Sequence, residues 1–223
     1  MLPRAANTSN LSARCVVVAI ALCGAASPAF SATEIFCGMG PPPGTATFAQ
    51  YNSRQETQRV SLGYVLVCEA TLDRFRFSDH ARPQVQSRRK VAFVTTDLSN
   101  TIFSALESIG VISDHFSDAG ALSLRQVFKT RDGSTVSAFE WDMAAAGGSV
   151  RWPSEGEKIS VLGNAARRTT LRTTSGKTYS SLAWTAGGRY LEVSMSSDFI
   201  REDENQLLLG FAEALETAGV RRR

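Results

Sequence analysis

Both histidines of this chain lie in the same tripeptide, Ser-Asp-His. One copy is Ser78-Asp79-His80, and the other is Ser113-Asp114-His115, with Asp118 three residues further on. An imidazole beside carboxylates can bind a divalent metal ion or transfer a proton near neutral pH. If the fold brings the two copies together, the candidate metal ligands or acid–base groups are therefore Asp79, His80, Asp114, His115 and Asp118.

A simpler interpretation of the two tripeptides is that they are exposed turn residues. Adjacent residues of an extended chain point to opposite sides, so the aspartate and histidine of one copy do not readily bind one ion together. Aspartate also favours turns, because its carboxylate accepts hydrogen bonds from the nearby backbone. We expect both copies to lie in loops, and the sequence leaves the two interpretations open.

Two of the four cysteines, Cys37 and Cys68, follow the apolar segment near the amino terminus. In an oxidising compartment, two such cysteines most simply form one disulfide, and we expect this bond. The alternative is a pair of free thiols. A zinc site is not expected, because neither cysteine has a second cysteine or a histidine at the short spacing that zinc sites use.

Several signatures of enzymes are missing from the sequence. There is no GxSxG, HExxH or GxGxxG pattern. Ser175-Gly176-Lys177-Thr178 resembles the end of a phosphate-binding loop, but Leu171 occupies the position of that loop's first glycine. We therefore expect neither nucleotide binding nor a cofactor, apart from a divalent metal at the Ser-Asp-His sites.

A tryptophan-containing loop offers a second kind of candidate site. Arg151-Trp152-Pro153 lies between Gly147-Gly148 and Gly156. A large aromatic side chain on a glycine-hinged loop either anchors the loop in the core or faces a ligand. Because Tyr179 and Tyr190 are expected near strand ends, the candidate rim of an apolar cleft consists of Arg151, Trp152, Tyr179 and Tyr190.

The amino-terminal segment has the three-part pattern of a secretory signal peptide. Residues 1–14 carry two arginines and no acid, residues 15–26 are apolar, and mostly small residues follow up to Ala32. This apolar run is short for a membrane span, which needs about 20 residues. We expect cleavage after residue 31 or 32 and a secreted or periplasmic protein. An uncleaved leader that anchors the chain to a membrane is the alternative.

The rest of the chain is nearly neutral. The sequence has 24 basic and 21 acidic side chains, and residues 1–32 hold two of the basic ones and none of the acidic ones, which leaves 22 against 21. This balance lacks the positive field that nucleic-acid binding requires. The hydrophobic fraction of 43% is high enough for a folded core.

The first half of the chain carries weak structural signals. Residues 33–56, which contain three consecutive prolines, are expected to form an irregular arm. Alternating apolar residues predict strands at 59–67 and 91–94. Apolar residues spaced three or four apart predict a helix from about residue 98 to Gly110, and a loop is expected over 111–121.

The second half carries clearer signals. Asp132-Gly133 predicts a tight turn between strands at 122–130 and 135–143. Further strands are predicted at 159–162, 165–174, 178–184 and 190–195, with Leu182 and Trp184 on one face. A final helix is predicted from about Ser197 to Gly219, with acidic residues in its first turns, where the helix dipole favours them.

These elements predict an α+β fold: a curved, mainly antiparallel β-sheet of about six to eight strands, with two helices packed on one face. The expected organisation is a signal peptide at 1–32, the Pro/Gly-rich arm at 33–56, a single α+β domain at 57–219 and a basic tail at 220–223.

The leader and the missing catalytic patterns favour an exported, non-enzymatic binding or accessory protein. Its expected partner is an envelope protein or a small apolar ligand. One alternative is a metal-assisted or acid–base hydrolase that uses the two Ser-Asp-His copies. A second alternative is a membrane-anchored accessory subunit of the cell envelope, which requires that the leader stays attached.

Overall fold

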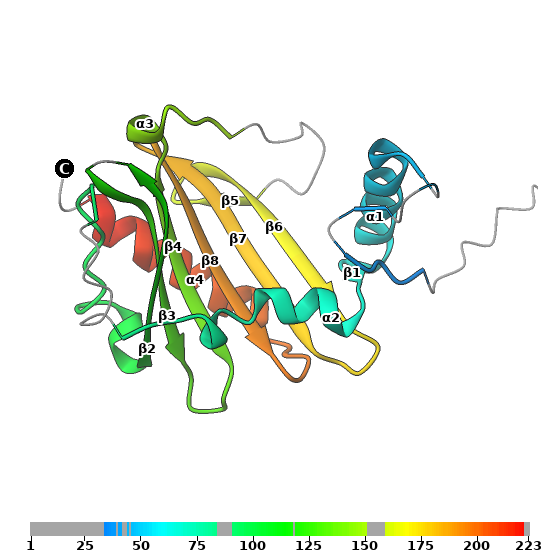
Figure 1. Cartoon of the computed structure of the whole chain (residues 1–223). Helices are drawn as coiled ribbons and strands as arrows, with labels where there is room; N and C mark the ends of the chain where they lie inside the picture. The colour runs from blue at the N-terminus through cyan, green and yellow to red at the C-terminus, as the bar shows by residue number, and fades with distance from the viewer. Residues whose placement is uncertain are drawn as a thin grey trace, which may run out of the picture. The chain divides into compact units, whose positions relative to one another are not determined.

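The computed structural model describes residues 34–38, 40, 41, 44, 46–83, 91–117, 119–150 and 159–220, with the side chains of residues 114–116 and 220 excepted. These residues form a mixed α+β fold around one open sheet (Figure 1). Its strands are β1 (Val65–Leu66), β2 (Glu107–Ser117), β3 (Gly120–Lys129), β4 (Thr135–Asp142), β5 (Ile159–Val161), β6 (Asn164–Arg172), β7 (Thr178–Ala186) and β8 (Arg189–Ser197). Its α-helices are α1 (Phe48–Leu62), α2 (Glu69–Leu72), α3 (Met143–Ala146) and α4 (Glu204–Val220), and its 3₁₀ turns are η1 (Asp73–Phe75), η2 (Phe77–Asp79) and η3 (Ile102–Ala105).

The sheet consists of two antiparallel meanders joined at their last strands. Strands β2, β3 and β4 form one meander, and β6, β7 and β8 form the other. Strand β4 pairs with β8 antiparallel, so the order across the sheet is β1-β6-β7-β8-β4-β3-β2. Strand β5 also pairs with β6. Strand β1 is the exception in direction, because it pairs with β6 in parallel.

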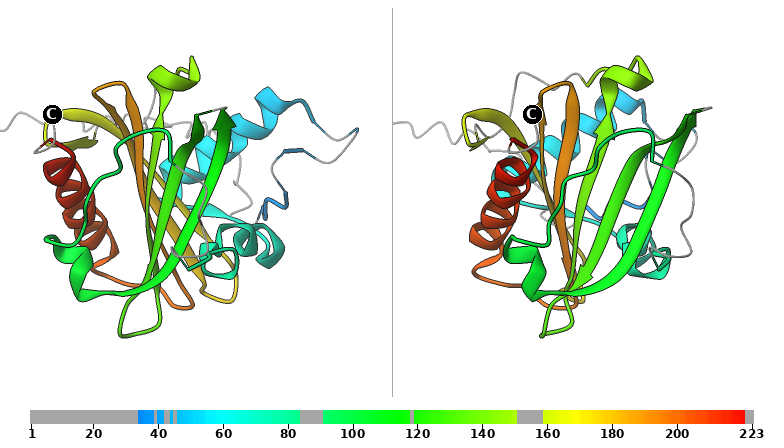
Figure 2. Two further views of the ribbon diagram at one scale, coloured as in Figure 1. Left: turned by 60° about the vertical axis from the view of Figure 1, so that its left-hand side comes forward. Right: turned by 90° about the vertical axis from the view of Figure 1, so that its left-hand side faces the viewer.

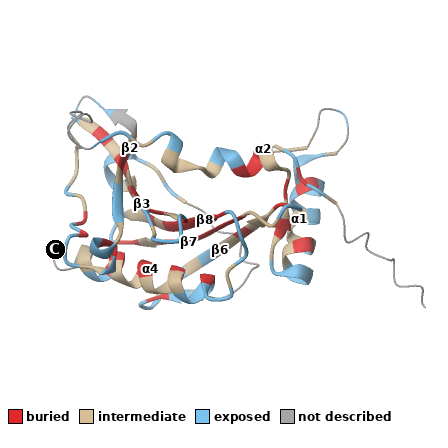
Figure 3. Cartoon of the chain, turned by 90° about the horizontal axis from the view of Figure 1, so that it is seen from below, coloured by how far each residue is buried: buried red, intermediate tan, exposed pale blue. Residues whose placement is uncertain are grey.

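Helix α4 covers one face of the sheet, and the α2–η1–η2 segment lies over the opposite face (Figure 2). Seen from below, buried residues run along the strands between these two layers (Figure 3). The core under α4 includes Leu182, Trp184 and Val193 of the sheet and Leu208 and Leu215 of the helix. Leu182 and Trp184 therefore share the α4 face, as predicted, but nearly all residues of β7 are buried, because its other face is covered as well.

A second, smaller core lies on the opposite face. The amino-terminal arm, here residues 34–38, contributes Phe36, which packs edge-on against Tyr51 of α1 at 5.2 Å between ring centroids. Phe75 of η1 stacks on Tyr179 of β7 at 4.4 Å. These contacts attach the first third of the described chain to the sheet face that α4 leaves uncovered.

The expected strand at 59–67 is wrong over most of its length. Helix α1 begins after Thr47, whose hydroxyl accepts from the Gln50 N–H while the Gln50 side chain accepts from the Thr47 N–H. The helix ends at Gly63, which adopts the left-handed conformation at φ 79°. The expected irregular arm therefore also ends earlier, since residues 48–56 are helical. The alternating apolar residues near the end of α1 favour a strand, and the prediction gave them more weight than the two cap signals of a helix.

The expected helix from residue 98 to Gly110 is also wrong. Only Ile102–Ala105 form a 3₁₀ turn, and Phe103 rather than Ile102 is buried there. Residues 107–117, most of which were expected to be helix end and loop, form β2 and pair with β3. Gly110 lies at a register shift in this pairing. A Cβ atom there would approach the Arg82 carbonyl oxygen to 2.3 Å, so the glycine permits a close backbone contact and does not end a helix.

The elements of the second half agree with the predictions to within a few residues. The Asp132-Gly133 turn joins β3 to β4, and β5 to β8 occupy the predicted positions. Helix α4 begins at Glu204, several residues later than expected. Of the two helices that were expected on one face of the sheet, only α4 is present. The other is reduced to the turn η3, which contacts α4. No helix in the described part of the chain is both long enough and apolar enough to cross a lipid bilayer.

Candidate functional site

The first Ser-Asp-His tripeptide lies in η2 and at its carboxyl end. Asp79 and His80 are exposed, and the Ser78 hydroxyl donates to an Asp79 carboxylate oxygen at 3.2 Å. This geometry matches the turn interpretation of the first copy. The second copy lies in strand β2 and not in the expected loop, because residues 113, 114, 116 and 117 pair with β3.

A single backbone bridge brings the two tripeptide segments near each other. Arg82 and Val111 pair antiparallel and exchange two backbone hydrogen bonds of 3.0 and 2.8 Å. The first copy ends two residues before Arg82, and the second begins two residues after Val111. The side chains of Asp114 and His115, and all of Asp118, lie outside the described residues. Within the described residues, no group of three or more His, Cys, Asp or Glu side chains is arranged to hold a metal ion.

The expected aromatic rim is only partly within the described chain. Arg151 and Trp152 lie outside it. Tyr179 is only 3% exposed, so it belongs to the second core and does not line a rim, which corrects the expectation. Burial raises the pKa of Tyr179. Tyr190 is half-buried, and its hydroxyl donates to Glu192 at 3.1 Å.

A polar row crosses the sheet beneath η2. The Arg125 guanidinium pairs with the Glu192 carboxylate at 3.0 Å, and both side chains are nearly buried, at 13% and 14% exposed. Arg125 also donates to the Ser137 hydroxyl at 2.8 Å. Its charge lies over the rings of Phe77 and Phe139, at 3.9 and 4.5 Å from the centroids. Because Arg125 binds side chains of the sheet and also contacts the Phe77 ring of η2, it holds η2 on the sheet.

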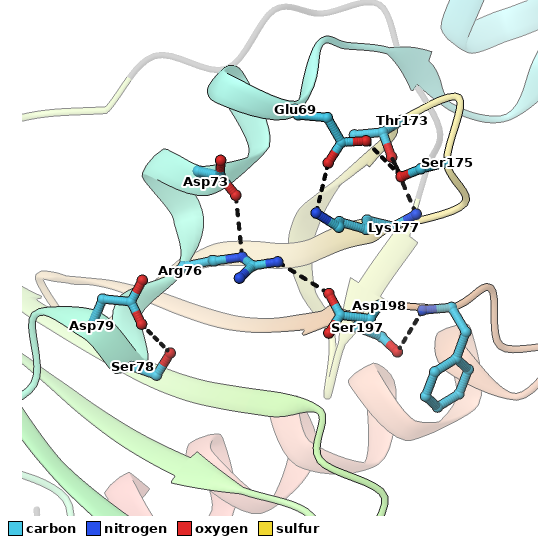
Figure 4. Close-up of polar contacts among 11 residues, drawn as sticks. Glu69, Asp73, Arg76, Ser78, Asp79, Thr173, Ser175, Lys177, Ser197 and Asp198 are labelled. Carbon is cyan, nitrogen blue, oxygen red and sulfur yellow. Dashed lines mark hydrogen bonds and ion pairs between the residues drawn. The ribbon is translucent and has the colours of Figure 1, made fainter.

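A charged network connects the α2–η2 segment to the strand ends. The Glu69 carboxylate lies between the Lys177 ammonium, at 2.8 Å, and the Ser175 hydroxyl, at 2.5 Å (Figure 4). Arg76 lies between Asp73 and Asp198, at 3.2 and 3.1 Å. These contacts link α2 to the β6–β7 turn and η1 to the end of β8.

The protonation states of this network do not suit nucleophilic catalysis. The hydrogen bond from Lys177, followed by that from Ser175, lowers the pKa of Glu69 to about 2. The hydrogen bond to Glu69 in turn raises the pKa of Lys177. A lysine held protonated cannot accept the proton of Ser175, and a carboxylate with so low a pKa is a weak base. The network is suited to holding elements together.

A groove of ≈ 770 Å³ separates α1 from β6. The α1 side contributes mostly polar residues and the apolar Val60, which is 72% exposed. Val65 of β1 and Leu171 of β6 line the other side. Sequence reasoning missed this groove because it placed an irregular arm and the start of a strand where α1 is. The signal that could have found α1 is the pair of caps around residues 48–62, Thr47 with Gln50 and then Gly63.

Cys37 and Cys68 are separate thiols in the structure, so the expected disulfide is not formed in it. The Cys68 thiol interacts with the neighbouring Cys37 thiol and contacts the Thr71 hydroxyl at 3.2 Å. The contact with Cys37, followed by that with Thr71, lowers the pKa of Cys68. The same contact with Cys68 raises the pKa of Cys37.

Comparisons with protein-family models, with curated proteins and with solved structures each return no match for this chain.

Proposed function

We propose that this chain is an exported, non-enzymatic binding protein whose groove between α1 and β6 holds an extended segment of a partner envelope protein. The observation that carries the proposal is the groove itself. It is large enough for several side chains, at ≈ 770 Å³, and it presents an apolar residue, Val60, to solvent. Val65 and Leu171 extend this apolar surface along the floor of the groove, and a concave surface with apolar lining residues suits a binding partner.

The shape of the groove favours a polypeptide over a small apolar ligand. Small-molecule sites usually enclose most of their ligand. Here the helix side is largely exposed, as an elongated partner beside a helix requires. The charged lining residues are Glu56, Arg59 and Arg167, which gives a positive balance. The proposed segment therefore carries apolar side chains together with acidic ones.

Three further features belong to the proposal. Export rests on the leader pattern of residues 1–32, with a secreted or periplasmic location. A Cys37–Cys68 disulfide rests on the adjacent thiols. A membrane-anchored accessory subunit is the alternative if the leader is retained, and amino-terminal sequencing of the exported protein separates these two outcomes.

A peptide-binding experiment tests the groove. The probe is a fluorescein-labelled octapeptide of alternating valine and glutamate, titrated against the full chain by fluorescence anisotropy. Val60→Glu adds a negative charge at the rim and should weaken binding about tenfold or more. Val94→Glu is the matched control, because Val94 is 63% exposed and does not line the groove. Equal affinity for both variants, or no saturable binding, would contradict the proposal.

A second candidate function is the metal-assisted or acid–base hydrolase that uses His80 and His115. The observation in its favour is the Arg82–Val111 bridge, which brings the two tripeptide segments near each other. Metal analysis of untagged protein tests this function, together with thermal shifts in zinc, calcium and manganese. A stoichiometric metal that is lost in both His80→Ala and His115→Ala would support the hydrolase over the binding protein.

A further inference from the structure

Cys37 and Cys68 directly follow the two residues of a parallel bridge, Phe36 and Val67. Two backbone hydrogen bonds fix this register. The Phe36 N–H donates to the Leu66 carbonyl at 2.9 Å, and the Cys68 N–H donates to the Phe36 carbonyl at 3.2 Å. Paired strands lie roughly 4.8 Å apart, and Cα atoms of disulfides lie roughly 4.4–6.8 Å apart. The backbone therefore already provides the spacing that a Cys37–Cys68 bond requires.

The environment of the two thiols suits reversible oxidation. Cys37 is exposed, so soluble or protein oxidants can approach the pair. The contacts of Cys68 with Cys37 and Thr71 lower its pKa and so favour its thiolate form, and the thiolate is the form that attacks disulfides. The same contacts stabilise the reduced pair. Because stabilising the reduced form raises the reduction potential, the bond should be easier to reduce than a buried structural disulfide.

The arm that carries Cys37 also holds α1 against the sheet. Phe36 packs on Tyr51, and the Gln58 side chain donates to the Glu34 carbonyl at 2.9 Å while it accepts from the Leu66 N–H at 2.7 Å. Tyr51 and Gln58 are the residues of α1 that are buried. The attachment of α1 thus depends on few contacts, and most of them involve the arm or β1.

We propose that Cys37 and Cys68 form a redox latch: a disulfide oxidant joins them, the bond fixes α1 beside β6, and reduction loosens α1. The Cys68 thiolate attacks the oxidant's disulfide, forming a mixed disulfide and releasing one thiol. Cys37 then attacks the Cys68 sulfur and releases the second thiol. Two protein thiols are oxidised, one external disulfide is reduced to two thiols, and the two cysteine protons pass to the released thiolates.

The effect of the latch on binding rests on the proposed function. A fixed α1 gives the groove a set width before the partner arrives, so less ordering is needed on binding. The oxidised protein should therefore bind the extended segment more tightly than the reduced protein. The closed loop contains all of α1, which means that the bond limits the opening of the wall of the groove itself.

Thiol labelling tests the chemistry of the latch. The full chain is prepared with Cys15→Ser and Cys23→Ser, so that Cys37 and Cys68 are its only thiols. The protein is equilibrated in reduced and oxidised glutathione mixtures, and free thiols are counted by maleimide labelling and mass spectrometry. The expected result is one transition between two and zero labelled thiols, with a linked Cys37–Cys68 peptide. Stable glutathione adducts on separate cysteines would overturn the proposal.

Hydrogen exchange tests the effect on α1. Amides of residues 48–62 should exchange about tenfold more slowly in the oxidised protein than in the reduced protein. Amides at the centre of β7 serve as the internal reference and should change much less. A Cys37→Ser/Cys68→Ser variant should exchange at the reduced rate in both buffers. Equal exchange of α1 in both redox states would refute the latch.

The octapeptide probe separates this inference from the proposed function. Binding that is about tenfold tighter in the oxidised state, and insensitive to buffer in the double serine variant, supports the control of the groove. Equal binding in both states refutes that control. Absence of binding in both states refutes the proposed function and with it the regulation, whereas the exchange result still decides whether the bond fixes α1.

Discussion

Some buried polar side chains in the described part of the chain are hydrogen-bonded in pairs that join neighbouring elements. Under α4, the Trp184 indole N–H donates to the Glu216 carboxylate at 2.9 Å, and both residues are buried. Such a bond matters most when one partner is removed, because the other is then left in a nonpolar environment without compensation. Stability effects at these positions should therefore exceed those of surface charges.

Trp184→Phe should destabilise the fold by about 2–4 kcal/mol, from the lost bond to a buried carboxylate and the smaller ring. The free energy of unfolding in urea measures this loss. The further change Glu216→Leu in the same chain should recover part of the loss, because it removes the unpaired carboxylate. A Trp184→Phe effect below about 0.5 kcal/mol would show that the bond contributes little.

Glu204, at the start of α4, is predicted to make stability depend on pH. The side chain is only 4% exposed, and burial raises the pKa of its carboxyl. A raised folded-state pKa contributes stability that is fully present below the unfolded pKa, about 4.3, and is lost as the pH rises through the folded value. Glu204→Gln stays neutral, so its stability relative to the wild type should increase from pH 4 to pH 8.

Urea midpoints at several pH values between 4 and 8 measure this difference. Glu202→Gln is the control, since Glu202 is exposed just before the same helix. The difference in urea midpoint between Glu202→Gln and the wild type should not increase across this range as the difference for Glu204→Gln does. A Glu204→Gln difference that is constant with pH, or that falls as the pH rises, would contradict the prediction.

At the scale of elements, two kinds of contact hold the α2–η1–η2 segment over the sheet. Charged side chains act at its amino-terminal end, and aromatic rings act in η1 and η2. Glu69 contacts the β6–β7 turn, while Phe75 and Phe77 lie against Tyr179. Exposed ion pairs contribute little individually. We therefore expect the rings to supply most of the attachment and the Glu69 contacts to set its position.

Glu69→Gln should remove an acid-sensitive contribution from this segment. The hydrogen bonds from Lys177 and Ser175 lower the pKa of Glu69 to about 2. A depressed pKa contributes stability that is present above the unfolded value, about 4.3, and is lost as the pH falls toward 2. The difference in melting temperature between wild type and variant should shrink over this range. In Lys177→Met, the effect of Glu69→Gln should be much smaller, and equal effects in both backgrounds would rule out the coupling.

The elements that could be predicted from the sequence were those with a local signal that agrees with their packing. Strands β3 to β8 combine turn residues such as Asp132-Gly133 with apolar residues that lie in the core, and α4 has an apolar stripe that meets the sheet. Helix α1 was missed because its sequence is mostly polar and its apolar end happens to alternate. Strand β2 was missed because it is an edge strand whose pattern is interrupted at Gly110.

The candidate sites were harder to predict because they depend on contacts between distant segments. The pairing of Phe36 with Val67, which places Cys37 beside Cys68, is a tertiary contact that no local pattern contains, although the sequence did single out the two cysteines. Burial of Tyr179 depends on Phe75 crossing over it. The groove depends on where α1 lies, and that position became known only with the fold.

At the scale of the whole molecule, β8 connects the two meanders, because it pairs with β7 on one side and with β4 on the other. We expect the meanders to open together and not as separate units. Native-state hydrogen exchange in low urea should give similar opening free energies for central amides of β3 and β7. A much lower value for β3 alone would show that the first meander unfolds independently.

The late position of β8 has a consequence for biosynthesis. Thr135 of β4 pairs with Ser196, and Asp142 pairs with Arg189, so β4 has no neighbour on that side until residues 189–196 have left the ribosome. Long-range pairings of this kind slow folding, and an unpaired strand edge invites aggregation in the meantime.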